Sequence, residues 1–256
     1  MLSARMKKPN RSIQLYSRRE ILKILGLGSV AALIADHLPD SFWDHSSVIS
    51  PSFAASPPAC VVRPEQTEGP YFVDEKIERS DIRRDPTDSS IKPGVPLRLE
   101  FQVSRVASGT CAPLRGAVVD IWHCDAQGIY SDVRDPRFDT RGKKFLRGYQ
   151  QADANGIAVF QTIYPGWYEG RAVHIHFKIR SSLDSQRARE FTSQLYFDEA
   201  VTDQIFKEAP YSGKRGRRVT NDADLIFRRG GNDLLLAPVK EAAGYAATFS
   251  IGLQSS

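Results

Sequence analysis

The sequence predicts a mainly β protein, an antiparallel β-sandwich with long loops and short helical pieces. From Pro96 the chain alternates apolar Leu97, Leu99, Phe101 and Val103 with polar residues, which is the period-two pattern of a half-buried strand. Further runs are short and are separated by glycine-rich turns, and this favours a sandwich over a parallel α/β arrangement. The 256 residues, with 18 Gly and 15 Pro, suit one sizeable core with many turns.

The other elements are expected where apolar runs are bounded by turn residues such as those at 153–156 and 229–233. A helix is expected from Glu199 to Lys207 with Asp198 as its N-cap, and a turn is expected near residues 222–227. The remaining strands are expected, in chain order, at Ala117 to His123, Gly156 to Tyr164, Val173 to Arg180, Thr192 to Phe197, Leu234 to Val239 and Tyr245 to Leu253.

Residues 1–35 are typical of an export signal. Arg18 and Arg19 precede an apolar run ending at Ala35, which resembles the twin-arginine translocation motif. The run is shorter than the roughly 20 apolar residues of a spanning helix, so we expect no stable membrane anchor after processing. Residues 36–58 are expected to be a disordered spacer that contains the processing site, and residues 59–256 the folded domain. The sequence thus predicts an exported protein, periplasmic or extracellular.

The charge of the chain does not indicate a nucleic-acid partner. The net charge is +5, but the first 54 residues hold seven of the 35 Lys and Arg and four of the 30 Asp and Glu, so the rest carries +2. A basic cluster remains at residues 214–218, with the sequence KRGRR. It is either a solvated loop or an anion-binding spot.

Three cysteines in an exported chain allow one disulfide and leave one thiol. An extended strand at 117–123 would hold Cys111 and Cys124 roughly 20 Å apart, which is too far for a bond. We therefore expect Cys60 to pair with one of the other two.

Two histidines lie on one face of an expected strand. His174 and His176 project together, while Val173, Ile175 and Phe177 form the opposite, apolar face. The pair predicts a metal site, and the alternative is a strand whose polar face meets water. With His123, the pair could also form a three-histidine zinc site of a hydrolase or lyase. A further alternative is a non-catalytic sandwich that binds a partner or carbohydrate through its loops.

Seven blocks between Cys60 and Asp198 carry a family resemblance. They are residues 64–72 (PEQTEGPYF), 116–123 (GAVVDIWH), 128–131 (GIYS), 145–148 (FLRG), 165–168 (PGWY), 171–177 (RAVHIHF) and 192–194 (TSQ). In this order they resemble the intradiol ring-cleavage dioxygenases, which include catechol 1,2-dioxygenase and the iron-bearing subunit of protocatechuate 3,4-dioxygenase. The resemblance implies a β-sandwich of the intradiol dioxygenase type and makes residues 59–256 the catalytic domain.

The resemblance also implies the ligands of a non-haem Fe(III) ion, which are Tyr130, Tyr168, His174 and His176. This set suits the ion, because a hard trivalent cation favours phenolate oxygen and neutral imidazole can complete the site. A free tyrosine has a pKa of about 10, so binding at neutral pH requires the metal to displace the phenolic proton. Tyr164 precedes Pro165 and continues a strand, so we assign it to packing.

Further roles follow from the same resemblance. Arg171 and Gln194 are implied to bind the substrate and to stabilise its developing negative charge, and Tyr168 to leave the metal and accept a proton. Tyr71 is implied to line the substrate pocket, with the alternative that its ring fills the sandwich core. Ala172 stands where many relatives have proline. His123 and Cys124 are assigned to packing or to support of the site.

The implied reaction is cleavage of an aromatic ring between two adjacent hydroxyl-bearing carbons, with insertion of both atoms of O2 to give a cis,cis-muconate-type diacid. The expected partners are therefore a small aromatic diol and O2. Which catechol is the substrate, and the oligomeric state, are left open by the sequence.

Overall fold

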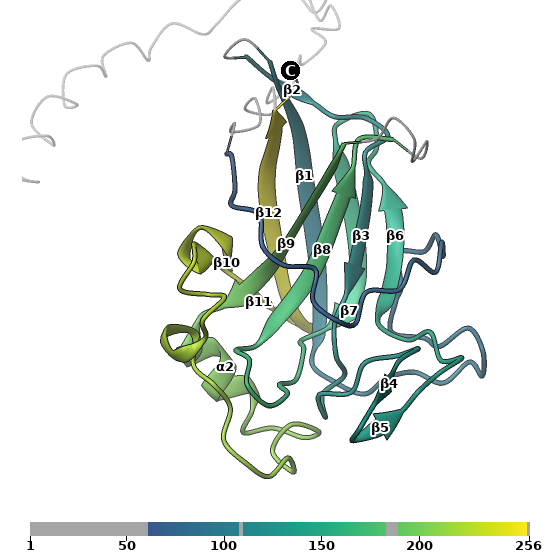
Figure 1. Ribbon diagram of the computed structural model, residues 1–256, viewed down its shortest axis with the longest axis vertical. Coiled ribbons are helices and arrows are strands. Elements are labelled where there is room, and N and C mark those ends of the chain that lie inside the picture. Colours follow the sequence, from purple (N-terminus) through teal and green to yellow (C-terminus); the bar gives the residue numbers. More distant parts are fainter. Residues whose placement is uncertain (1–60, 108–109, 183–188, 255–256) are drawn as a thin grey trace, which may run out of the picture. The chain divides into compact units, whose positions relative to one another are not determined.

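Two five-stranded sheets pack face to face in the computed structural model (Figure 1), which describes residues 61–107, 110–182 and 189–254. The first sheet, here the site sheet, has the order β10-β9-β8-β3-β6. Its strands are β10 (Leu235–Leu236), β9 (Glu190–Phe197), β8 (His174–Arg180), β3 (Val118–Trp122) and β6 (Arg147–Gln151). The predicted signal and spacer, at 1–35 and 36–58, lie outside the described residues.

The second sheet, here the backing sheet, has the order β11-β12-β1-β2, with β7 also paired to β1. Its strands are β11 (Val239–Glu241), β12 (Gly244–Gln254), β1 (Pro96–Ala107), β2 (Thr110–Pro113) and β7 (Ile157–Ile163). A separate two-stranded ribbon joins β4 (Arg134–Asp135) to β5 (Phe138–Asp139). The predicted mainly β sandwich is confirmed.

The core lies between the two sheets because each strand turns alternate side chains inward. Phe101 of β1 packs against Phe177 of β8 and Phe249 of β12, with ring centroids 5.4 and 5.9 Å apart. Ile175 and Ile179 share this inward face and are fully buried. The outward face of β8 therefore carries His174 and His176, as the alternation predicts.

Two strand pairs are parallel, so the sheets are mixed rather than wholly antiparallel. Strand β12 runs parallel to β1, and β10 runs parallel to β9. The strand predicted at 234–239 is also divided, into β10 and β11. Pro238 lies at the break and has no N–H to donate to a ladder.

The predicted helix is α2 (Glu199–Ile205), and the carboxylate of Asp198 accepts from the N–H groups of Ala200 and Val201 at its start. Two short 3-10 helices follow, η1 (Asn221–Ala223), which overlaps the start of the predicted turn, and η2 (Gly231–Leu234). Within the described ranges, no helix is long and apolar enough to cross a membrane.

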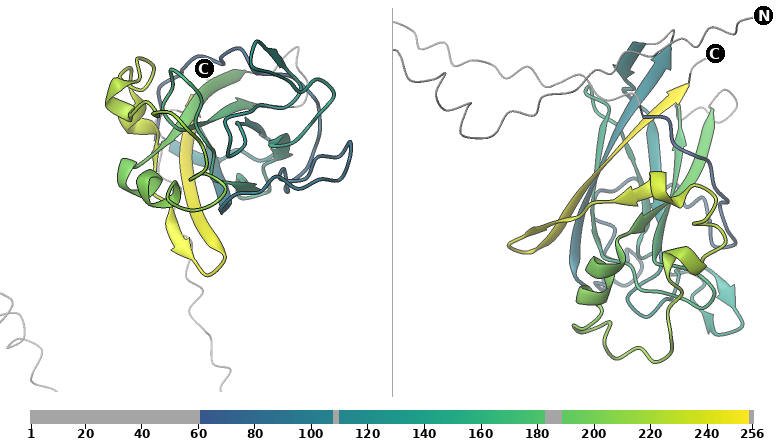
Figure 2. Two further views of the ribbon diagram at one scale, coloured as in Figure 1. Left: turned by 90° about the horizontal axis from the view of Figure 1, so that it is seen from below. Right: turned by 90° about the vertical axis from the view of Figure 1, so that its left-hand side faces the viewer.

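An extended stretch, residues 61–82, crosses the outward face of the site sheet and is here named the covering segment (Figures 1 and 2). Its backbone bonds link it to β9 on one side of β8 and to the edge strand β6 on the other. Gln66 N–H donates to Thr192 of β9, and Arg79 N–H donates to Tyr149 of β6. The covering segment therefore passes over β8, the strand that carries the two histidines.

Cys111 of β2 is disulfide-bonded, and Cys124 is a free, buried cysteine. The expected pairing of Cys60 with one of them involves a residue outside the described part of the chain. Burial raises the pKa of the Cys124 thiol well above its ordinary value, so this group is an unreactive part of the core.

Candidate active site

The histidine pair forms the centre of the site. The Nε2 atoms of His174 and His176 lie 3.0 Å apart, and both side chains are buried. His174 Nδ1 lies 2.7 Å from the carbonyl oxygen of Ala172, so Nδ1 carries the proton and Nε2 keeps its lone pair. Burial, helped by the charge of Arg171, lowers the pKa of His174 to about 3, and burial also holds that of His176 well below its ordinary value. Both rings are neutral donors of the kind that binds metals.

Tyr168 and Tyr130 bring two phenols to the same place. The hydroxyl of Tyr168 lies 3.4 Å from His174 Nε2, and its ring meets the ring of Tyr130 edge-on at 5.6 Å. The Tyr130 hydroxyl is buried and has no hydrogen-bond partner among the described residues. Burial raises the pKa of Tyr168 to about 12 and holds that of Tyr130 well above its ordinary value. Without a metal ion, both phenols therefore keep their protons at neutral pH.

The four donors together fit a trivalent metal ion. A buried hydroxyl without a partner is costly, and a cation that displaced its proton would relieve that cost. Two phenolate oxygens and two neutral imidazoles suit hard Fe(III). No three His, Cys, Asp or Glu side chains in the described ranges form a group able to hold a metal. The donors that the structure brings together are two phenols and two imidazoles.

Arg171 lies beside Tyr168 and Gln194, the other two residues to which the resemblance gives a catalytic role. Its Nη2 donates to Gln194 Oε1 at 2.5 Å, and its Nη1 is 3.5 Å from the Tyr168 hydroxyl. Gln194 Nε2 donates to the carbonyl oxygen of Thr67 in the covering segment, which fixes the orientation of the amide. Tyr196, opposite His174 across the two strands, donates to Gln194 Oε1 at 3.1 Å.

Asp224 holds Arg171 from the opposite side and was not predicted as a site residue. Its Oδ2 accepts from Arg171 Nε at 2.9 Å and from the N–H of Ala172 at 2.8 Å. Burial would raise the pKa of Asp224, but the Ala172 N–H and the charge of Arg171 together keep it below its ordinary value. The sequence predicted the turn that contains Asp224, but it gave no sign of a partner 53 residues away.

Tyr71 lies over the phenols rather than in the core between the sheets. Its ring stacks on Tyr130 with centroids 4.5 Å apart, and it meets Tyr168 edge-on at 5.8 Å. Its hydroxyl donates to Asp135 Oδ2 at 2.7 Å. In the same segment, a Cβ added at Gly69 would stand 3.1 Å from His176 Cε1. The covering segment thus excludes water from the side of the site that it faces.

Arg147 supports Tyr130 and Tyr71 together, and this role was not predicted. Its side chain is buried; Nε donates to Ser131 Oγ at 2.7 Å, and the guanidinium also donates to the carbonyl oxygens of Ser131 and Tyr71. One planar cation therefore joins the loop that carries Tyr130 to the segment that carries Tyr71.

His123 does not join the histidine pair. Its Nδ1 lies 2.8 Å from the carbonyl oxygen of Cys124, and its Nε2 lies 2.7 Å from Thr162 Oγ1. Burial lowers the pKa of His123 to about 4. With both ring nitrogens engaged, His123 is not available as a third zinc ligand.

Tyr164 also lies away from the four donors. Its ring packs against Phe197 with centroids 4.4 Å apart, and its hydroxyl bonds with Thr202 Oγ1 at 2.7 Å. This is the environment of a packing residue.

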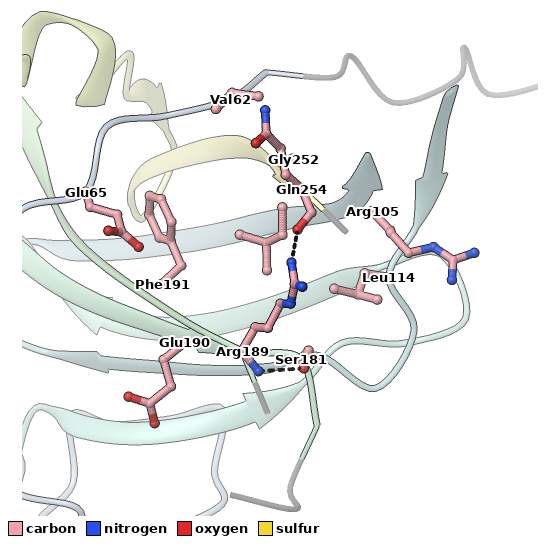
Figure 3. Close-up of a pocket in the computed structure, with 11 residues that line it drawn as sticks. Val62, Glu65, Arg105, Leu114, Ser181, Arg189, Glu190, Phe191, Gly252 and Gln254 are labelled. Atoms are coloured by element: carbon pink, nitrogen blue, oxygen red, sulfur yellow. Dashed lines mark hydrogen bonds between the residues drawn. The ribbon is translucent and has the colours of Figure 1, made fainter. Parts of the chain in front are cut away.

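Two cavities lie near the ends of the sandwich. One, of about 490 Å³, is lined by Val62, Phe191 and Leu253 with charged residues around them (Figure 3), and it contains none of the predicted site residues. The other, of about 270 Å³, is lined in part by Trp167 and Tyr168. The second cavity therefore borders the donor cluster.

Comparison with known proteins identifies the family to which this chain is similar. A family model described as Dioxygenase matches residues 67–224. The chain is 27% identical to chlorocatechol 1,2-dioxygenase of Pseudomonas sp. (strain P51) over 198 residues, covering 70% of this chain and 68% of the relative. It is 30% identical to the protocatechuate 3,4-dioxygenase beta chain of Burkholderia cepacia over 145 residues, covering 52% of this chain and 60% of that one.

Among solved structures, an intradiol ring-cleavage dioxygenase from Tetranychus urticae is 31% identical to this chain, with a TM-score of 0.65. The match covers 75% of this chain and 94% of that one. The dioxygenase domain of a carbohydrate-binding fusion protein from Streptomyces sp. SirexAA-E is 26% identical, with a TM-score of 0.53, and covers 77% of this chain and 100% of that domain.

Proposed function

Because the chain belongs to the intradiol ring-cleavage dioxygenases, a family of oxidoreductases, we propose that it uses a non-haem Fe(III) ion to cleave a catechol-type ring between its two hydroxyl-bearing carbons. Both atoms of O2 would enter the product, a cis,cis-muconate-type diacid. The observation that carries the proposal is the convergence of two buried phenols and two neutral imidazoles, with the Tyr130 hydroxyl otherwise without a partner.

Tyr130, Tyr168, His174 and His176 would hold the ion. Two phenolates would compensate two of its three positive charges, and the imidazoles would add neutral donors. When bound, the ion supplies Lewis acidity that holds the diol in its deprotonated form and makes the ring reactive towards O2. The protein contributes the positions of the donors and a site largely closed to water.

Tyr168 is the residue placed to move a proton. Its hydroxyl is within reach of both His174 Nε2 and Arg171 Nη1. We infer that its phenolate oxygen accepts a proton from one hydroxyl of the incoming diol. The adjacent guanidinium stabilises negative charge at that point.

Arg171 and Gln194 would orient the ring and stabilise charge that develops on it. Asp224 binds Nε of Arg171, so both Nη groups face the site. The amide of Gln194 is fixed by the covering segment. Donors held in advance need little reorganisation during the reaction, which is the main source of electrostatic catalysis.

The substrate is proposed to be a small aromatic diol, since relatives named for chlorocatechol and protocatechuate share this chemistry. Export through a twin-arginine route, to the periplasm or the exterior, also stays a proposal, based on Arg18 and Arg19 and the apolar run that follows them.

The test is to purify the full chain after expression with iron, and to measure bound iron, visible absorption and O2 uptake with a panel of catechols. Phenolate bound to Fe(III) should give a reddish protein, and O2 uptake should match diol consumption one to one. Tyr130→Phe should change or abolish the visible band and the activity. Tyr164→Phe removes a buried phenol outside the donor cluster and should keep both. An iron-loaded protein without a visible band or O2 uptake would disprove the proposal.

A further inference from the structure

The basic residues of the cluster at 214–218 lie in different surroundings. Arg218 pairs with Glu199 and Asp203, which accounts for its charge within the fold. Lys214 instead lines the 270 Å³ cavity that also borders Tyr168. The remaining basic residues of the cluster, Arg215 and Arg217, are exposed.

Lys214 is held at this cavity by two contacts. Its Nζ donates to the carbonyl oxygen of Gln127 and stands 4.6 Å from the centroid of the Trp167 ring. Gly216 keeps the loop against the same indole, because a Cβ there would lie 2.9 Å from Trp167 Cη2. The ammonium group is therefore placed by the loop and by a cation–π contact.

No carboxylate in the described ranges forms an ion pair with Lys214. The other cation at the cavity, Arg137, differs because it pairs with Asp135 at 3.0 Å and lies 3.8 Å from Glu169. Burial lowers the pKa of Lys214, because the charged ammonium group is partly removed from water. An ammonium has three donors, and the carbonyl of Gln127 uses one of them.

The walls of the cavity suit an aromatic or aliphatic side group that ends in an anion. Ile129, Phe138 and Trp167 are apolar. The charged lining residues are the neighbours Arg137 and Glu169, which lie 3.8 Å apart, and Lys214, which has no ion pair in the described ranges. Tyr168 forms the wall towards the donor cluster, where its hydroxyl lies 3.4 Å from His174 Nε2. A diol held by the donor cluster could thus direct a substituent past Tyr168 into the cavity that Lys214 lines.

From this arrangement we propose that the cavity binds the carboxylate of a catechol with an acidic side group, and that Lys214 is the residue that selects it. The inference rests on the proposed function, since it adds a preference among diols to that activity. A charge-assisted bond in a partly desolvated place should favour an acid over its neutral counterpart by roughly tenfold to a hundredfold.

The experiment uses the full iron-loaded chain and one matched pair of diols, 3-(3,4-dihydroxyphenyl)propanoate and its primary amide. They have nearly the same shape and differ in charge. We expect kcat/KM to be at least tenfold higher for the acid than for the amide. Lys214→Met should bring this ratio near one, Lys214→Arg should keep most of it, and Arg217→Gln, which removes an exposed charge from the same loop, should leave it unchanged.

Equal kcat/KM for acid and amide in the wild type would overturn the assignment of Lys214 and leave ring cleavage intact. If Lys214→Met lowered kcat/KM by the same factor for both diols, the assignment of Lys214 would also be overturned, because that result indicates a structural effect. If neither diol nor catechol is consumed, the proposed function fails. In that case, calorimetry without O2 can still compare the binding of the acid with that of the amide. Equal dissociation constants would show that the cavity does not select a carboxylate.

Discussion

The indole of Trp122 lies flat against the imidazole of His176, with ring centroids 5.0 Å apart and planes 5° apart. The two residues are opposite each other across β3 and β8, so strand register sets the contact. His176 Nδ1 is buried without a hydrogen-bond partner in the described part of the chain. Stacking therefore fixes the ring of His176, whereas a hydrogen bond to Ala172 fixes that of His174.

Gly69 confines the same imidazole from the covering segment, and Gly69→Ala should disturb it. The new Cβ would be 3.1 Å from His176 Cε1, and the backbone has a φ of +74°. We expect a loss of about 1 kcal/mol or more in stability from the backbone alone, together with weaker iron binding measured by chelator competition.

Gly142→Ala is the matched control for that change. Gly142 has a similar φ of +82°, but nothing lies within 4 Å of a Cβ added there. It should lose comparable stability and keep its iron affinity. If both variants bind iron equally well, the contact of Gly69 with His176 does not matter for the metal.

Arg147→Met should displace Tyr130 and Tyr71 together. The substitution removes the donors to Ser131 and to the Tyr71 carbonyl oxygen, and buried acceptors without partners cost about 1–3 kcal/mol each. We expect unfolding at lower urea concentration and a shifted visible band in the iron-loaded protein.

Arg79→Met is a control for general destabilisation. Arg79 also donates to backbone carbonyl oxygens, at Arg84 and Arg147, but it contacts neither tyrosine. It should lower stability and leave the visible band in place. An unshifted band in Arg147→Met would show that Arg147 does not position Tyr130.

Strand β8 shows which features of the site could be predicted from the sequence. The alternation in β8 predicted that His174 and His176 share a face, because side-chain direction in a strand follows from its period. Tyr130 was found through resemblance alone, since one tyrosine in a loop carries no periodic signal. Asp224 and Arg147 act across 53 and 16 residues respectively, and no local pattern records such contacts.

The pairing of the strands could not be predicted from the sequence either. The alternation in β1 shows which side chains are buried, but it does not say that β12 lies parallel to it. Strand β6 was not predicted because its sequence, RGYQQ, has no apolar alternation. Its place is set by antiparallel pairing with β3.

Asp224→Asn should reduce kcat more than it raises KM. The change weakens the hold on Arg171 Nε, and a catalytic group misplaced by about 1 Å can cost roughly a hundredfold in rate. We expect a loss of between tenfold and a hundredfold in kcat. Asp222→Asn alters an exposed neighbour and should keep the wild-type rate. An equal loss in both variants would point to the turn rather than to Arg171.

Acid should destabilise the metal-free protein from about pH 6.5 downwards. The folded state keeps His123 neutral to about pH 4 and His174 to about pH 3, while His176 is also held well below its ordinary pKa. In the unfolded chain, histidines take up protons near pH 6.5. Unfolding therefore binds more protons as the pH falls, and stability should drop by about 1.4 kcal/mol per pH unit for each such histidine.

Asp120 opposes part of this loss. Burial raises the pKa of its carboxyl group to about 6 in the folded state. Between about pH 6 and its ordinary pKa, the folded state therefore holds a proton on Asp120 that the unfolded chain has released. Urea unfolding at pH 7.5, 6.0 and 5.0 measures the net slope. His123→Asn should make the slope shallower. Constant stability over this range would contradict the buried, neutral state of these rings.

Strand β12 supplies a parallel neighbour to β1, with Leu97 opposite Tyr245 and Val103 opposite Ile251. The backing sheet therefore cannot close until residues 244–254 have left the ribosome, and before that β1 presents an open edge of the kind that associates with other chains. A chain stopped ahead of β12 would also lack Phe249 and Ile251 from the core on which β8 rests. Completion of the donor cluster thus has to wait for β12, so iron would be taken up by a chain whose sandwich has already folded, the form in which the proposed export route would carry it.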